Sequence, residues 1–294
     1  MPARRQPPPT LRLRRLAAEL RRLRGEVGLT REEVTDRTGI NAATLYRIEM
    51  VQARPQRRTL MALLELYSVP DDDRAALLEL LRQAGEPSWI QTFPGSLPEA
   101  YTTFFLFESE ATTVLNYEAL FVPGLLQTED YARGIYRGTV PTATRDEIRN
   151  LVEARMSRQG VLTRDVPLRL WAIVDEAALH RPVGGHKVMA AQLDHLAESA
   201  TELPHVTLQV IPYDVGAHPG MTASFAVLQF GGDPPTGDVV YHESQTGDLF
   251  LENETDVARF TAIFEHLRAM ALAPEQSTAL LRRIARDMRG GAEA

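Results

Sequence analysis

The segment 29–49, LTREEVTDRTGINAATLYRIE, constrains the fold most, because it has the pattern of two short helices joined by a tight turn. Thr30 and Glu33 are spaced as a capping box, which predicts the start of the first helix. Gly39 supplies a permissive backbone at the bend. Asn41 is a good N-cap for the second helix. The spacing therefore predicts a helix-turn-helix unit.

The second helix of this unit is predicted to point most of its side chains outward. Leu45 and Ile48 lie on one helical face and are expected in the core. Small residues at the start of a helix, with an arginine one turn later, suit a helix that enters the major groove of DNA. The residues expected to face the groove are Asn41, Ala42, Ala43, Thr44, Tyr46 and Arg47. Taken alone, this stretch is equally compatible with two helices of an ordinary bundle.

Flanking apolar periodicities predict three further helices around this unit. The residues expected to pack inward are Leu13, Leu16, Ala17, Leu20, Leu23 and Val27 before it, and Leu60, Leu63, Leu64, Tyr67, Leu77, Leu78 and Leu81 after it. The last helix is expected over residues 71–84. Five short helices, with the helix-turn-helix second and third, are typical of a DNA-binding domain.

Residues 11–84 resemble the lambda-repressor-like, or Cro-type (xenobiotic-response-element, XRE), regulators through LRRLR, GLTREEV and GINAATLYRIE. The resemblance implies that Ala42, Ala43 and Arg47 occupy base-reading positions and that Arg31 contacts a phosphate. It also implies a structural salt bridge between Arg24 and Glu49.

Two departures from the family pattern affect the expected contacts. Thr35 stands where a small alanine is usual, and alanines at 42 and 43 replace polar residues that often read bases. Direct readout is then expected from Thr44, Tyr46 and Arg47, with alanine contacts to thymine methyl groups.

Charge is distributed unevenly along the chain. The whole chain has a formal net charge of −7, whereas residues 1–58 hold fourteen arginines and six acidic residues, a balance of +8. The remaining residues hold eighteen basic and thirty-three acidic side chains. A basic surface is what phosphate binding requires. We expect Arg54, Arg57 and Arg58 to contact the DNA backbone beside Arg31.

The length of 294 residues predicts two domains. Residues 1–10 are expected to be a disordered arm, and the Pro- and Gly-rich segment 85–98 a linker. There is no cysteine, which excludes disulfides and cysteine-ligated zinc. With no signal-peptide core and no apolar run near the roughly 20 residues that span a bilayer, a cytoplasmic, non-membrane protein is expected.

Residues 99–294 are predicted to form an α+β domain. Strands are expected over residues 168–174, 206–210 and 225–229, with a hairpin formed by 239–243 and 249–252 across residues 244–248. Helices are expected over residues 127–138, 145–159, 187–199, 257–267 and 280–288. Residues 101–110 and 118–126 fit no single pattern.

This second domain resembles the large domain, without an assigned catalytic activity, of many actinobacterial Cro-type regulators. The motifs that carry the resemblance are FVPGLLQTEDYAR, EARMSRQGVL, DEAALHR, LQVIPYDVGAHPG and VVYHES. Such regulators are antitoxin-like, are often encoded beside a small partner protein, and several act in development or antibiotic production. The resemblance therefore implies a protein partner rather than a cofactor.

No catalytic or metal site is expected in this domain. The group Asp175, Glu176, His180 and His186 has no metal-ligand spacing, and consecutive carboxylates after a strand usually point to opposite sides. Ser224 and Ser244 lack the setting of a nucleophile elbow. The turn 215–221, VGAHPGM, is compatible with the lining of a ligand pocket or with a plain hairpin loop.

The sequence thus predicts a DNA-binding transcriptional regulator whose second domain dimerises and binds a small partner protein. One alternative is a repressor that senses a small molecule in a pocket of this domain, and a remote alternative makes the domain an enzyme. Because one short reader helix covers few base pairs, a homodimer on an inverted repeat of double-stranded DNA is expected.

Overall fold

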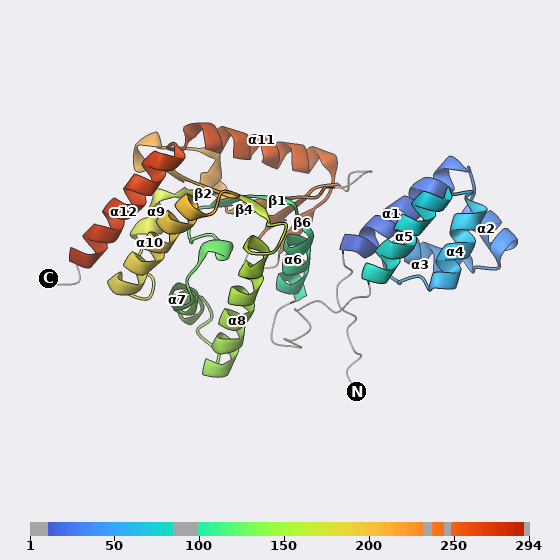
Figure 1. Cartoon of the computed structure of the whole chain (residues 1–294), viewed down its shortest axis with the longest axis horizontal. Coiled ribbons are helices and arrows are strands. Elements are labelled where there is room, and N and C mark those ends of the chain that lie inside the picture. The colour runs from blue at the N-terminus through green and yellow to red at the C-terminus, as the bar shows by residue number, and fades with distance from the viewer. Residues whose placement is uncertain (1–10, 85–98, 232–236, 244–247, 291–294) are drawn as a thin grey trace. The chain divides into compact units, whose positions relative to one another are not determined.

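A computed structural model describes residues 11–84, 99–231, 237–243 and 248–290 of the chain. These residues form two compact units that divide at residues 92 and 93 (Figure 1). The expected arm 1–10, the expected linker 85–98 and most of the expected hairpin loop 244–248 lie outside the described residues.

The N-terminal unit consists of five helices, as predicted: α1 (Leu11–Glu26), α2 (Arg31–Thr38), α3 (Ala42–Glu49), α4 (Arg57–Leu66) and α5 (Asp71–Gln83). Its core collects predicted leucines of α1, α3, α4 and α5, including Leu16, Leu45 and Leu60, which are fully buried, and Val34 of α2. Val27 was expected in this core but is 39% exposed. The reason is that α1 ends at Glu26 and Gly28 then turns the chain with a φ of +66°.

The C-terminal unit is built on one mixed sheet of six strands in the order β3-β2-β1-β4-β5-β6. The strands are β1 (Thr113–Glu118), β2 (Arg169–Asp175), β3 (Val206–Ile211), β4 (Phe225–Gln229), β5 (Val239–His242) and β6 (Leu249–Leu251). β1, β2 and β3 run parallel, whereas β4, β5 and β6 alternate in antiparallel pairs. The α+β prediction is confirmed, and β5 pairs with β6 as expected for a hairpin.

Among the described residues, seven α-helices accompany this sheet: α6 (Glu99–Glu110), α7 (Glu129–Thr139), α8 (Arg145–Arg158), α9 (Glu176–His180), α10 (His186–Glu202), α11 (Glu254–Met270) and α12 (Pro274–Gly290). Short 3-10 turns lie at Gly124–Leu126, Gln159–Leu162, Tyr213–Val215 and Pro219–Thr222. Thr128 caps α7, and Thr144 caps α8 through a full capping box with Glu147. The helices expected over residues 127–138 and 145–159 are therefore present, and each begins within two residues of its predicted start.

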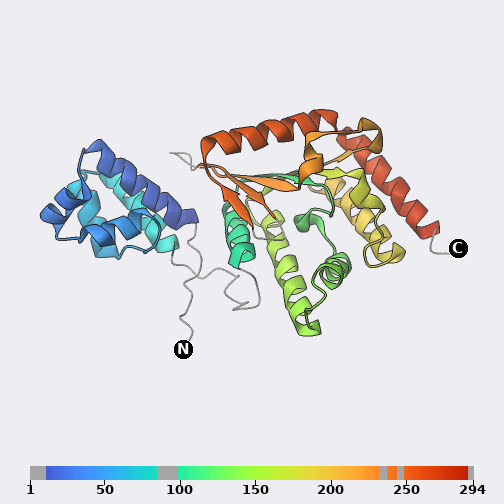
Figure 2. The same cartoon turned by 180° about the vertical axis from the view of Figure 1, so that it is seen from behind.

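The two faces of the sheet have different covers. α11 lies along one face, where Phe264 and Leu267 pack with Leu115, Tyr117 and other strand residues. Figures 1 and 2 show α6, α7 and α8 on the opposite side of the sheet from α11. Because neighbouring side chains of a strand point to opposite faces, Glu118 lies on the α6 and α8 side.

The segments left unassigned from the sequence include α6, and the central strand β1 was not predicted. The residues of α6 from Thr103 to Glu108 are all buried, so no polar face marks the helical period. β1 carries Asn116 and Glu118 on a sheet face that is otherwise largely apolar. Leu115, Asn116, Tyr117 and Glu118 do alternate apolar and polar residues, but this run is only four residues long and was not recognised as a strand.

Candidate nucleic-acid interface

The turn between α2 and α3 has the geometry that its residues predict. Thr30 Oγ1 accepts a hydrogen bond from the Glu33 backbone N–H at 3.2 Å, and Glu33 in turn accepts from the Thr30 N–H at 2.7 Å. Gly39 ends α2 in the left-handed region with a φ of +73°, which an L-residue with a Cβ adopts only with strain. Asn41 Oδ1 caps α3 by accepting from the Ala43 N–H at 2.8 Å.

Helix α3 is anchored along one side and leaves another side open. Leu45 and Ile48 are buried in the helical core. Asn41, Ala43, Tyr46 and Arg47 are exposed, and Ala42 and Thr44 are partly exposed. Tyr46 is the largest of these side chains and is 44% exposed. All six residues expected to face a groove are therefore at least partly exposed to solvent, and they lie on α3 or at its N-cap.

Glu49 fixes α3 to the two preceding helices. Its carboxylate is fully buried and accepts two hydrogen bonds from Arg24, at 2.6 Å from Nε and 3.2 Å from Nη2. Arg31 Nε donates to the second carboxylate oxygen at 2.8 Å, a contact that was not predicted. The guanidinium of Arg31 also lies over the Tyr46 ring, 5.2 Å from its centroid. Burying a carboxylate is costly unless it is paired and hydrogen-bonded, and here both oxygens are used.

The remaining arginines of the predicted interface differ in how they are held. Arg47 folds back over the first turn of α3, with Nε 3.3 Å from the Ala43 carbonyl oxygen and Nη2 3.3 Å from Thr44 Oγ1. Arg54 Nη2 donates to the carbonyl of Leu81 at 2.7 Å and so ties the α3–α4 connection to the end of α5. Arg57 and Arg58 are exposed in the first turn of α4.

Thr35, which departs from the family pattern, is accommodated without loss of a hydrogen bond. Its hydroxyl donates to the carbonyl of Arg31 one turn earlier, at 3.0 Å. This back-bonding satisfies the hydroxyl inside the helix. The substitution therefore leaves the shape of α2 intact.

The titratable residues considered in the C-terminal unit form local hydrogen bonds. Asp175 Oδ1 caps α9 by accepting from the Ala177 N–H at 2.8 Å, and Asp175 Oδ2 pairs with His218 Nε2 at 3.1 Å. Glu176 accepts from the Tyr213 N–H at 2.9 Å and contacts His180 Nε2 at 3.2 Å.

The other residues considered there lie apart from this group. His186 is exposed at the start of α10. Ser224 Oγ accepts from the Ala119 N–H at 3.0 Å, and Ser244 lies outside the described residues. Within the described ranges, no three His, Asp or Glu side chains are grouped so as to hold a metal ion.

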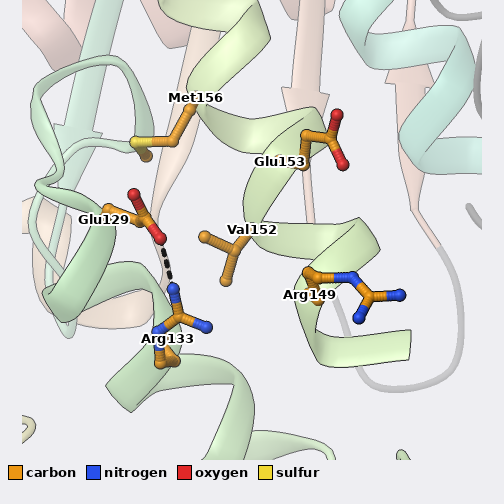
Figure 3. Close-up of a pocket in the computed structure, with 6 residues that line it drawn as sticks. All are labelled: Glu129, Arg133, Arg149, Val152, Glu153 and Met156. Atoms are coloured by element: carbon orange, nitrogen blue, oxygen red, sulfur yellow. Dashed lines mark hydrogen bonds and ion pairs between the residues drawn. The ribbon is translucent and has the colours of Figure 1, made fainter. Parts of the chain in front are cut away.

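Two hollows on the C-terminal unit are open and charged. One, of about 250 Å³, lies between α7 and α8, where Arg133 pairs with Glu129 across from Arg149 and Glu153 (Figure 3). The other, of about 680 Å³, lies between the strand ends near Glu176 and the Arg283 and Arg286 side of α12. Of the turn 215–221, no residue lines either hollow. A search of the described helices finds none long and apolar enough to cross a bilayer.

Comparison with known proteins supports the division into two units. A model described as a helix-turn-helix domain matches residues 15–77. A family model described as a domain of unknown function, DUF5753, matches residues 101–283, more than half of the chain. No curated protein and no solved structure matches the chain. The chain therefore belongs to the DUF5753 family, and the helix-turn-helix domain that precedes this region makes it a DNA-binding regulator.

Proposed function

We propose that this protein is a sequence-specific transcriptional regulator of the Cro/lambda-repressor (XRE) type, acting as a homodimer on an inverted repeat. The observation that carries the proposal is the open face of α3 from Asn41 to Arg47, which Leu45, Ile48 and Glu49 hold to the core from the other side. A rigid helix with small residues at its start can approach base edges in the major groove.

The exposed residues of α3 divide by chemistry into different kinds of DNA contact. Arg47 would contact the O6 and N7 atoms of a guanine, for which it must leave its weak contacts on the first turn of α3. The methyl groups of Ala42 and Ala43 suit the methyl group of thymine. Thr44 and Tyr46 supply the hydroxyl groups nearby.

Backbone contacts are assigned to the arginines at the ends of the flanking helices. Arg57 and Arg58 are exposed for phosphates. Arg31 uses Nε for Glu49, and its Nη groups make no hydrogen bond with the residues that the structure describes, so they can reach a phosphate oxygen. Arg54 uses only Nη2 in its hydrogen bond to the Leu81 carbonyl, so Nε and Nη1 can contact a phosphate as well. We therefore propose that Arg31 and Arg54 support the domain and contact DNA at once.

We propose that residues 99–294 form the dimer and receive the regulatory input from a small partner protein. The support is the resemblance to antitoxin-like regulators and the short reach of a single reader helix. Half-sites about one helical turn apart, or a multiple of it, would follow from such a dimer. Binding of the partner would change the spacing of the two reader helices and so the affinity for DNA.

Selection of DNA from a random pool by the full chain tests this function. We expect an inverted repeat, and sedimentation of the free full chain should give twice the mass of 32.8 kDa. Ala43→Glu places a carboxylate on the open face of α3 and should abolish binding. Ala18→Glu, the same change on an exposed position of α1, is the matched control and should leave binding unchanged. Selection of no common sequence would contradict the proposal.

A further inference from the structure

Two carboxyl groups share one face of the sheet at the edge where β1 ends. Asn116 and Tyr241 both pair with Ala226 of β4, so Glu118 and Glu243, two residues further along their strands, lie on the same face on either side of β4. β2 and β3 lie on one side of β1, and β4, β5 and β6 lie on the other. The direction in which successive strands are added to the sheet therefore reverses at β1. In open sheets with parallel strands, ligands bind outside the carboxyl end of the strand where the order reverses. Glu118 is the last residue of β1, and Glu243 directly follows β5.

Arg155 of α8 reaches this group without a carboxylate partner. Its Nη1 donates to Gln127 Oε1 at 2.7 Å, and its Nη2 donates to the Tyr101 hydroxyl, which shares a hydrogen bond of 2.8 Å with the hydroxyl of Tyr136. The guanidinium lies over the Tyr136 ring at 4.8 Å. Its Nε is buried and has no hydrogen-bond partner. All partners of this cation are therefore neutral.

Arg155 lies close enough to Glu118 and Glu243 to affect their pKa values, as it does for Glu108, yet it forms an ion pair with none of the three. The charge of Arg155 lowers the pKa of these carboxyl groups, but none of its nitrogens lies within 4.0 Å of a carboxylate oxygen among the described residues. Burial outweighs this effect and raises the pKa of Glu118 to about 7, despite hydrogen bonds from Ser224 and Asn116. Partial desolvation and the charge of Asp248 raise the pKa of Glu243, although its side chain is exposed to solvent.

The next turn of α8 shows what a completed pair looks like in the same surroundings. Arg158 forms two hydrogen bonds to Glu108 of α6, one of them 2.8 Å from Nη2 to Oε1, and both side chains are buried. Its guanidinium also lies over the rings of Phe104 and Phe105. Arg158 needs no further anion. The separation of charge around Arg155 is therefore a local feature and not a general property of this face.

We propose that Arg155, Glu118 and Glu243 bind a small zwitterion of the α-amino acid class at this edge of the sheet. Its carboxylate would bind Arg155, including the unpartnered Nε, and its ammonium group would lie between Glu118 and Glu243. The rings of Tyr101 and Tyr136 would flank the guanidinium. A simple anion would leave both carboxyl groups without a positive partner, and a simple cation would leave Arg155 without a negative one. This site is separate from the helix-turn-helix and does not depend on DNA binding.

Direct binding to the full chain tests the proposal without DNA. Each of the twenty common amino acids is added at about 10 mM, and the melting temperature is recorded; we expect one or a few to raise it. For such an amino acid, calorimetry should show at least about tenfold weaker binding of its carboxamide and of its deaminated acid. No shift with any amino acid, or equal binding of all three compounds, would overturn the proposal.

Proton release gives a second readout near neutral pH. An ammonium group beside Glu118 lowers its pKa, so binding near pH 7 should release a proton, seen as a buffer-dependent heat. Glu118→Gln should remove most of that release. Arg155→Gln should weaken binding, whereas Arg149→Gln, at an exposed α8 position paired with Asp146, should not. Unchanged affinity and proton release in both site variants would exclude these residues from the site.

Discussion

Glu49 in the N-terminal unit and Arg155 in the C-terminal unit are both charged groups set among packed helices, but their partners differ. The carboxylate of Glu49 meets two arginines and uses both oxygens. The guanidinium of Arg155 meets hydroxyl and amide oxygens and no carboxylate within the described part of the chain. The ion pairs of Glu49 hold α3 in place, so that its exposed side can contact another molecule. Arg155 has no carboxylate partner, so its charge is available to a ligand.

The largest effect is expected from breaking the closed network. Glu49→Gln leaves Arg24 and Arg31 facing each other without a buried anion and should cost about 3–5 kcal/mol in the free energy of unfolding of the N-terminal unit. Urea unfolding, followed by a probe in that unit, measures it. Glu26→Gln is the control, because Glu26 pairs with Arg22 at the exposed surface and should contribute about 0–1 kcal/mol. Similar costs for the two variants would contradict the structural role of Glu49.

The C-terminal unit allows the same comparison within one helix. Glu108→Gln should cost about 3–5 kcal/mol because it strands the buried Arg158. Arg155→Gln removes hydrogen bonds to neutral groups and strands no ion-pair partner, so a cost of about 1–2 kcal/mol is expected. Equal costs in thermal or urea unfolding would mean that Arg155 is paired as closely as Arg158.

Arg47 tests whether the surface fixed by Glu49 reads DNA. Arg47→Ala should weaken binding to the selected site by about 1–3 kcal/mol and relax the preference at one base pair. Its contacts in the free protein are long hydrogen bonds on its own helix, so stability should change little. Titration against the selected site and its single-base variants distinguishes the outcomes. Equal weakening on every sequence would make Arg47 a phosphate contact.

Features that depend on residues close together in the sequence could be predicted, whereas contacts between residues far apart in the sequence could not. The capping box at Thr30 and the turn at Gly39 depend on neighbours in sequence, so their residue types sufficed to predict them. Arg31 and Glu49 lie 18 residues apart and Arg155 and Tyr101 54 apart. Such contacts depend on tertiary packing. The resemblance supplied the Arg24–Glu49 pair but neither of these contacts.

The group around Arg155 left only a faint signal in the sequence. Glu118 ends a strand that was itself missed, and Tyr101 begins a segment that fitted no pattern. Arg155 lies in the predicted helix 145–159, where an arginine is ordinarily solvent-exposed. Asn116 and Glu118 on one strand were the available hint, since polar residues directed into a packed face commonly have a function.

The pH dependence of stability tests the unpaired state of Glu118. The raised pKa means that the folded protein holds a proton which the unfolded chain releases between about pH 4.5 and 7. The wild-type protein should therefore lose stability relative to Glu118→Gln as the pH rises through that window, and the difference should level off above it. Asn116, Ser224, Glu243 and Arg155 are present in both proteins, so the difference isolates Glu118. A constant difference would indicate an ordinary carboxyl pKa.

The smallest effect is expected at the exposed arginines of α4. Arg57→Ala and Arg58→Ala should each reduce the slope of log affinity against log salt concentration by about one unit and leave the base preference unchanged. Neither should alter stability measurably, because both side chains are exposed at the start of the helix. Arg31→Ala and Arg54→Ala should reduce the slope similarly but also lower stability, since Glu49 and the Leu81 carbonyl lose a donor. An unchanged slope in the Arg57 and Arg58 double variant would show that the start of α4 does not contact DNA. The phosphate contacts would then have to come from other basic residues near α3.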